Sequence, residues 1–84
     1  MELAEQARAV SSHAELVAFI TALVADQQRD DTGFMNVDLG SFLEAMGGWL
    51  ADADGFYQNQ GEQLAQQSPW RLMADALMAA RTYE

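Results

Sequence analysis

The sequence predicts an all-α protein: a compact bundle of three main helices, at about residues 13–28, 38–53 and 69–83, with a short N-terminal helix. Two observations predict this class. Apolar residues recur at intervals of three and four, which places them on one face of a helix, and no alternating strand pattern competes. Helix-capping residues also stand where two of these segments begin. The 84 residues suffice for a single helical domain over residues 1–84.

The N-terminal segment, residues 1–10, predicts a short helix. Leu3, Ala7 and Val10 are four and then three residues apart, so a helix would place them on one face. A helix of about ten residues is marginal in isolation, so this segment must pack against other helices to be stable.

The second helix is predicted from about His13 to Gln28. Ser12 is followed three residues later by Glu15, and the two form a capping box ahead of an apolar run. Residues 29–37 contain turn-forming residues and are predicted to be a loop. The apolar side chains predicted to share one stripe on this helix are Leu16, Val17, Ile20, Leu23 and Val24.

The third helix is predicted from about Asp38 to Ala53, with Asp38 or Asn36 as its N-cap. The pair Gly47-Gly48 inside it costs about 1 kcal/mol per glycine relative to alanine. A ridge away from the apolar stripe contains three small residues. These could admit a close helix from the same chain or a second copy, or the glycines could simply kink the helix. The stripe consists of Leu39, Phe42, Leu43, Met46, Trp49, Leu50 and Ala53, and the ridge of Gly40, Glu44, Gly47 and Ala51.

The last helix, predicted over residues 69–83, has the clearest start. Ser68 is a favourable N-cap, and Pro69 occupies the first helical position, where its missing N–H costs nothing. Residues 54–67 before it are predicted to be a long polar loop, with room for a short helical turn at 62–66. Two nearly opposite apolar faces predict a central position between other helices. These faces are Trp70, Met73, Ala74 and Leu77, and Leu72, Ala76, Ala79 and Tyr83.

The charge of the chain excludes several functions. Thirteen acids oppose four arginines, no lysine is present, and the net charge is −9. Such a chain repels nucleic-acid phosphates and anionic membrane surfaces, so neither is an expected partner. Residues 26–62 hold eight acids and only Arg29, a net charge of −7, whereas residues 63–84 are neutral. This acidic region suits a basic protein partner, although solubility alone would also account for it.

Asp52 and Asp54 lie against a local electrostatic preference. Both are predicted at the C-terminal end of the third helix, where the helix dipole disfavours anions by roughly 0.3–1 kcal/mol each. This placement makes them candidate binding groups. In the alternative interpretation, Arg71 or Arg81 pairs with them structurally. Arg81 lies close to the apolar face of the last helix, so we expect it to have a partly buried acidic partner.

No catalytic or metal-binding site is predicted. The absence of cysteine excludes disulfides, thiolate metal ligands and a cysteine nucleophile. His13 is the single histidine; it is expected at the surface near a helix start, and it would leave zinc with carboxylate ligands alone. The acids and glycine between Asp52 and Glu62 fit neither register of a calcium-binding EF-hand loop. We therefore expect no enzymatic activity, no catalytic residue, no metal and no cofactor.

Two aromatic residues, Phe56 and Tyr57, fall within the predicted polar loop. In one interpretation they pin this loop onto the bundle and enlarge a small core. In the other, one of them anchors a protein partner beside the acids, because exposed aromatic side chains next to charges are common in binding hot spots.

The motif Trp49-Leu50-Ala51-Asp52, followed by Gly55-Phe56-Tyr57-Gln58-Asn59, resembles a family of small acidic bacterial proteins catalogued only as a domain of unknown function. The resemblance covers most of the chain and is weakest over residues 1–10, while the pair Gly47-Gly48 departs from the family pattern. The resemblance implies a bacterial source and a domain of this size. Because the C-terminal residues match the end of the family pattern, it also implies a complete chain, but it implies no activity. Further matching segments are Phe42-Leu43-Glu44-Ala45, Trp70 and Ala79-Ala80-Arg81-Thr82-Tyr83-Glu84.

These observations predict a non-catalytic protein that binds a basic protein through the acidic surface of residues 26–62, in the manner of an inhibitor or immunity-type protein. A cytoplasmic location is expected, because no basic-then-apolar leader and no long apolar segment are present. The alternatives are a structural homo-oligomer, such as a homodimer, and a small-ligand or metal-binding module that uses the 52–62 loop. The residues expected to bind the partner are Glu44, Asp52, Asp54, Tyr57 and Glu62.

Overall fold

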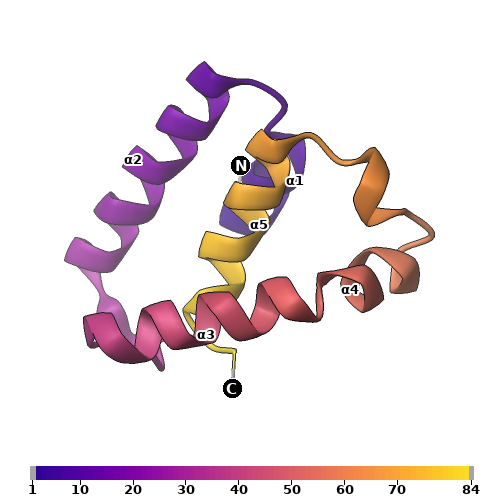
Figure 1. Cartoon of the computed structure of the whole chain (residues 1–84). Helices are drawn as coiled ribbons and strands as arrows, with labels where there is room; N and C mark the ends of the chain where they lie inside the picture. Colours follow the sequence, from indigo (N-terminus) through magenta and orange to yellow (C-terminus); the bar gives the residue numbers. More distant parts are fainter. Residues whose placement is uncertain (1, 84) are drawn as a thin grey trace.

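The computed structural model describes residues 2–83 and confirms the all-α prediction (Figure 1). This part of the chain forms five α-helices and two short 3₁₀ helices, without a strand. The α-helices are α1 (Leu3–Ala9), α2 (His13–Arg29), α3 (Leu39–Ala51), α4 (Ala53–Asn59) and α5 (Pro69–Ala80), and the 3₁₀ helices are Asp31–Gly33 and Leu64–Gln66.

Side-chain caps fix the starts of the three longest helices. Ser12, Asp38 and Ser68 each accept a hydrogen bond from the backbone N–H three residues further along the chain, ahead of α2, α3 and α5. The sequence predicted two of these caps directly, and the structure selects Asp38 over Asn36 for the third.

The segment 54–67, predicted to be a polar loop, is largely helical. α3 ends at Ala51, and after a break at Asp52 the chain continues as the seven-residue helix α4. Ala53 and Tyr57 are buried four residues apart on one face of α4. The loop prediction gave the glycine and amide residues of this segment too much weight, and it overlooked this helical spacing.

A glycine turn ends α4 and sets the direction of the chain beyond it. Gly61 has a φ of 75°, a conformation that glycine adopts without steric cost. The N–H of Glu62 donates to the carbonyl of Tyr57 at 2.8 Å, and that of Gly61 to the carbonyl of Gln58 at 3.0 Å. This pair of bonds is a Schellman cap, and it brings Glu62 into reach of Arg71 on α5.

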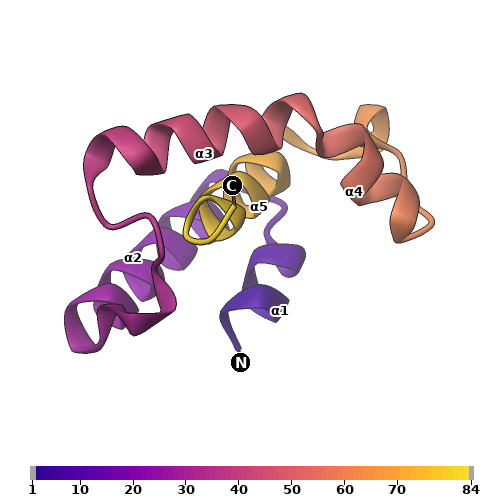
Figure 2. The ribbon, with the colours of Figure 1, turned by 90° about the horizontal axis from the view of Figure 1, so that it is seen from below.

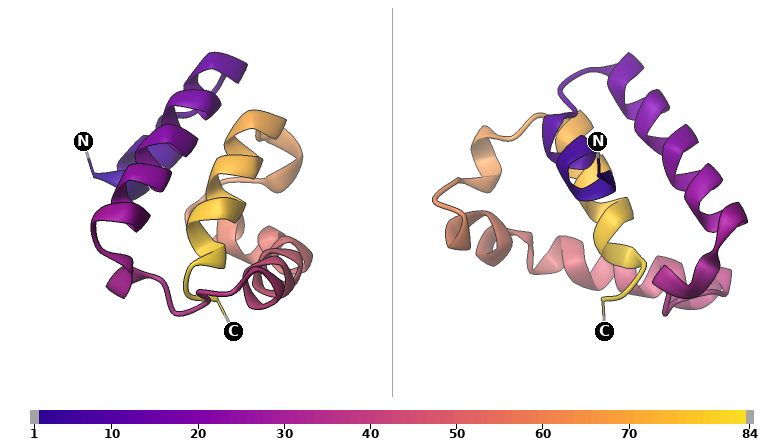
Figure 3. Two further views of the ribbon diagram at one scale, coloured as in Figure 1. Left: turned by 90° about the vertical axis from the view of Figure 1, so that its left-hand side faces the viewer. Right: turned by 180° about the vertical axis from the view of Figure 1, so that it is seen from behind.

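The helix α5 lies at the centre of the fold, as its two apolar faces predict. It contacts α1, α2 and α3, and it ends at Ala80 rather than at residue 83. From below, α3, α5 and α1 lie in successive layers (Figure 2), and from behind α1 covers α5 (Figure 3). Within residues 2–83, α2 and α3 do not contact each other directly, and they diverge like the arms of an L (Figure 1).

Two clusters of buried side chains meet at α5. Ala74 of α5 belongs to the first cluster and Ala76 to the second, so neighbouring helices pack close to the α5 backbone. The first cluster joins α1, α2 and α5 through Ala7, Val10, Phe19, Leu23 and Ala74. The second joins α3, α4 and α5 through Trp49, Ala53, Tyr57 and Ala76.

The predicted apolar stripes of α2 and α3 are only partly buried. Leu23 of α2 and Trp49 of α3 are in the core, as predicted. Phe19 and Ala45 are buried as well, although the predicted stripes did not include them. Each helix packs along one narrow line, and no described element covers the neighbouring flank. The residues of the predicted stripes that are exposed instead are Val17, Ile20, Val24, Leu39, Leu43 and Leu50.

Candidate functional site

The structure divides the five predicted partner-binding residues between different environments. Tyr57 and Glu62 belong to a hydrogen-bonded network inside the fold. Glu44 and Asp52 line an open pocket along α3. Asp54 is exposed on α4 and shares a shallow surface depression with Glu62.

Arg71 is the centre of the internal network. The Tyr57 hydroxyl donates to Oδ2 of Asp75 at 2.7 Å, and Nε of Arg71 donates to the same oxygen at 3.1 Å. The two terminal nitrogens of Arg71 donate to the two carboxylate oxygens of Glu62 at 2.7 and 3.1 Å. This paired geometry is the strong form of an arginine–carboxylate interaction. The guanidinium group also lies 5.4 Å from the centroid of the Tyr57 ring.

Burial and neighbouring charges shift the pKa values of the groups in this network. Burial raises the pKa of the Tyr57 hydroxyl, and the Asp75 carboxylate that accepts its hydrogen bond raises that pKa further. Burial also raises the pKa of Asp75, while the hydrogen bonds from Tyr57 and the charge of Arg71 act against that rise. The hydrogen bonds from Arg71 lower the pKa of Glu62. Arg71 therefore stabilises both carboxylates in their charged form.

This network confirms that the aromatic residues enlarge the core. Tyr57 is fully buried and so is not exposed to a partner. Phe56 makes edge-to-face contacts with Tyr57 and Trp49, with ring centroids 5.0 and 5.1 Å apart. The structural ion pairs that the sequence allowed for Arg71 exist, but they involve Glu62 and Asp75 rather than Asp52 and Asp54.

Sequence reasoning missed Asp75, although a signal was present. Arg71 and Asp75 are four residues apart on one helix, which places them side by side. Asp75 also lines a pocket of about 210 Å³ between α1, α4 and α5, beside Arg8. A buried carboxyl with a raised pKa in a pocket is a feature of some catalytic sites. Here its Oδ2 is held by Tyr57 and Arg71, and its position is explained by the core.

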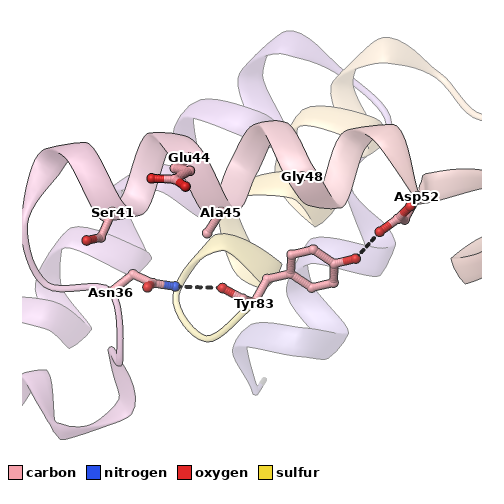
Figure 4. Close-up of a pocket in the computed structure, with 7 residues that line it drawn as sticks. All are labelled: Asn36, Ser41, Glu44, Ala45, Gly48, Asp52 and Tyr83. Atoms are coloured by element: carbon pink, nitrogen blue, oxygen red, sulfur yellow. Dashed lines mark hydrogen bonds between the residues drawn. The ribbon is translucent and has the colours of Figure 1, made fainter.

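The pocket along α3 contains the predicted residues Glu44 and Asp52, together with Tyr83, the last described residue. Its volume is about 470 Å³, and we call it the Tyr83 pocket. Figure 4 shows the Tyr83 ring lying along α3 with its hydroxyl directed to Asp52, to which it donates a hydrogen bond. The residues that line this pocket are Asn36, Ser41, Glu44, Ala45, Gly48, Asp52 and Tyr83.

Asn36 and Gly48 determine where Tyr83 lies. The side-chain amide of Asn36 donates to the carbonyls of Ala80 and Tyr83 at 2.9 and 3.0 Å, which ties the end of the chain to the α2–α3 connection. At Gly48, a Cβ atom would lie 3.4 Å from the Tyr83 ring. The ring thus lies against α3 at Gly48, at a distance that would be an ordinary contact for a Cβ atom.

The Tyr83 pocket has the chemistry of a cation-binding surface. Glu44 and Asp52 are exposed carboxylates at its wall, and no described arginine forms a salt bridge with either. The hydrogen bond to Asp52 raises the pKa of the Tyr83 hydroxyl and fixes the direction of the carboxylate. Among residues 2–83, no group of three or more His, Asp or Glu side chains is placed to hold a metal ion.

Two further predictions can be compared with the structure. The contacts of Arg81 with described side chains do not include the expected acid: its Nε donates to the Met78 carbonyl, and its guanidinium lies 5.6 Å from the Phe34 ring centroid. Most of the 52–62 segment, proposed as a ligand-binding loop, is the helix α4.

No helix in the described part of the chain is long and apolar enough to cross a membrane.

Comparison with known proteins places the chain without assigning it an activity. The model of a family of unknown function, DUF7660, matches residues 12–84, which is most of the chain and excludes α1. Neither a curated protein nor a solved structure was found to match.

Proposed function

Because the chain belongs to DUF7660, a family of unknown function, we propose its function from its own geometry: it is a non-catalytic module that binds a basic protein through the acidic surface of residues 26–62. Within that surface, the Tyr83 pocket receives a lysine or arginine side chain of the partner. The observation that supports this is the presence of Glu44 and Asp52 in one open pocket, where no described arginine pairs with them.

The arginines of the chain leave this surface strongly negative. Arg29, the one base of residues 26–62, pairs with Asp26, and Arg71 pairs with Glu62 from the other side. Asp54 adds a further exposed carboxylate beyond the pocket, on α4. A basic partner would be attracted over a distance set by ionic strength, so its association rate should fall as salt is added.

The hydrogen bond from Tyr83 prepares the pocket for a cation. It holds the Asp52 carboxylate in one direction before a partner arrives, so less side-chain freedom is lost on binding. We also propose that the protein acts in the bacterial cytoplasm as an inhibitor or immunity-type protein. That part of the proposal rests on the acidic composition, by analogy, and not on the site.

A capture experiment with a matched charge control tests the proposal. The immobilised chain is exposed to host lysate, and captured proteins are identified by mass spectrometry. The variant Glu44→Gln/Asp52→Asn should lose a specific basic protein that the wild type captures. The control Glu2→Gln/Glu5→Gln changes the net charge equally near α1 and should retain it. Equal capture by both double variants would show that the pocket does not bind the partner.

A further inference from the structure

A second surface, on the opposite flank of α3 from the Tyr83 pocket, is apolar and exposed. Its side chains are between 37% and 73% exposed, although they are large and hydrophobic. We call it the apolar face, and it consists of Val17, Ile20 and Val24 from α2, Leu39, Leu43 and Leu50 from α3, and Trp70 and Met73 from α5.

The three helices present these side chains toward one common surface. On α5, Ala74 packs in the cluster shared with α2 and Ala76 in the cluster shared with α3, so Trp70 and Met73 lie between the two contact lines. Within residues 2–83, α2 and α3 lie on different sides of α5 without contacting each other (Figure 1), and Trp70 and Met73 are exposed.

Contacts at the two ends of α2 relate it to the other two helices of the apolar face. Near the start of α2, the His13 ring meets the Trp70 ring edge-to-face at 5.6 Å. Near the end of α2, Gln27 shares a pocket of about 310 Å³ with Leu39 and Phe42 of α3. These contacts place α5 beside the start of α2 and α3 beside its end.

The spacing of the exposed residues is that of helices that bury a seam against another helix. Val17, Ile20 and Val24 are separated by three and four residues. Leu39, Leu43 and Leu50 fit the same alternation when the half-buried Met46 is included. In coiled coils, side chains with this alternation of three and four pack into the spaces of a facing helix.

The size of the apolar face is that of a protein interface. The exposed fractions correspond to roughly 700 Å² of apolar surface, whereas the largest patch on an ordinary monomer is about 300–600 Å². A standard interface buries about 800 Å² on each partner, so this face is close to that size. The chain is also thin, at 33 × 27 × 18 Å, and it exposes 5247 Å², slightly above the ~4,900 Å² expected for its mass.

The distribution of charge indicates which kind of partner binds the apolar face. Residues 16–25 of α2 are all uncharged, although the chain has a net charge of −9, and every member of the apolar face is uncharged as well. A basic helix would find a carboxylate only beyond these residues, such as Asp38 in the pocket beside Leu39. A second copy would bring only uncharged side chains together here, while Glu44 and Asp52 on the other flank of α3 would stay exposed.

We propose that the apolar face is the interface of a homodimer in which two copies of this chain bury it against each other. The interface is isologous: the same surface of each protomer meets its partner about a two-fold axis. The exposed side chains of α2 and α3 in one protomer then pack against the exposed side of α5 in its partner. This inference is independent of the basic partner, because the Tyr83 pocket remains outside the dimer interface.

Sedimentation velocity of the purified chain tests the proposal. At about 100 µM the wild type should sediment as a dimer, with twice the monomer mass of 9.2 kDa. The variants Leu43→Glu and Val24→Glu should weaken dimerisation at least about tenfold, because each buries a charge in the interface. Both positions are exposed within one chain, so the helical circular dichroism should be unchanged. The control Gln58→Glu adds the same charge on α4, outside the face, and should remain dimeric.

Two results would overturn the homodimer. The first is a wild type that is monomeric at about 100 µM, and the second is a Leu43→Glu variant that dimerises like the wild type. If the wild type is monomeric and Leu43→Glu abolishes capture of a lysate protein, the apolar face serves another protein instead of a second copy.

The dependence on salt separates this proposal from the proposed function. Two chains of −9 repel each other, so raising NaCl from about 0.05 to about 0.5 M should strengthen the homodimer several-fold. The same change should weaken a complex between the Tyr83 pocket and a basic protein. Loss of either behaviour alone would therefore contradict one proposal and leave the other intact.

Discussion

The two tyrosines of this chain make the same bond in two different environments. Tyr57 and Tyr83 each donate a hydroxyl hydrogen bond to an aspartate, Asp75 in the first case and Asp52 in the second. The first pair is buried and shares its carboxylate oxygen with Arg71. The second lies in an open pocket, where no described arginine reaches the carboxylate.

The difference shows which acids of this protein are available to a partner. A buried carboxylate needs its cation within the fold, because burying an unpaired charge is costly. An exposed carboxylate has no such need, and water can be replaced by a cation from another molecule. Both pairs contain a tyrosine, an aspartate and the bond between them. The position of Arg71 is what differs: it neutralises the buried aspartate and leaves Asp52 for the proposed partner.

The largest expected effect is the loss of the arginine from the buried pair. Arg71→Ala should lower the free energy of unfolding by roughly 3–5 kcal/mol, because Asp75 would remain buried without a cation. Urea unfolding followed by circular dichroism and tryptophan fluorescence measures this change. Arg29→Ala is the matched control; its side chain is 77% exposed in the pair with Asp26, so the expected loss is about 0–1 kcal/mol. Equal losses in the two variants would contradict the structural role of Arg71.

The two pairs also differ in how far the sequence could predict them. Arg71 and Asp75 are helical neighbours, so their contact was within reach of a local rule, but the burial that gives it importance was not. The Tyr83–Asp52 bond spans 31 residues and depends on Asn36 holding the end of the chain. No local pattern contains that information.

The same limit explains what was right and wrong in the fold. Capping by Ser12 and Ser68 is local chemistry, and the sequence predicted it correctly. The exposure of Leu43 depends on which helices lie nearby, because periodicity identifies an apolar side but not how much of it is covered. Turn-forming residues hid α4, whose stability comes from burying Tyr57.

Removing each hydroxyl tests the comparison directly. Tyr57→Phe should cost roughly 1–3 kcal/mol of stability, because Asp75 loses a donor in a buried position. Tyr83→Phe should cost no more than about 0.5 kcal/mol, because water can replace the lost donor at the surface. Chemical denaturation of both variants gives the two values, and a Tyr83→Phe loss as large as that of Tyr57→Phe would remove the distinction between the pairs.

Acid should weaken the buried network through Glu62. Its pKa in the folded chain is lowered by Arg71, so the stabilisation it provides is present above its ordinary value of 4.5 and is lost as the pH falls below it. The shift of Asp75 has the opposite sign: its raised pKa means that burial costs stability above its ordinary value of 3.8, and protonation relieves that cost.

The variant Glu62→Gln separates these two contributions. Between about pH 6 and pH 3, the wild type should lose more stability than Glu62→Gln, because only the wild type loses the charged bond to Arg71. Thermal unfolding at a series of pH values measures the difference. The Glu62 side chain is one-third exposed (33%), so we expect this effect to be smaller than that of removing Arg71. Parallel pH profiles for the two proteins would show that the Glu62 bond is unimportant.

The smallest effect concerns the glycine pair that adjoins the exposed tyrosine. A Cβ atom at position 47 would have nothing within 4 Å, so Gly47→Ala should stabilise α3 by about 0.5–1 kcal/mol through helix propensity alone. At position 48 the Cβ atom would meet the Tyr83 ring at 3.4 Å, an ordinary contact at its near limit, so Gly48→Ala should gain less. Gly48→Ala could instead destabilise the chain while Gly47→Ala stabilises it. That result would show that the Tyr83 ring is held tightly against α3 and does not shift to make room for a methyl group. The Tyr83 pair would then resemble the buried pair in its contribution to stability.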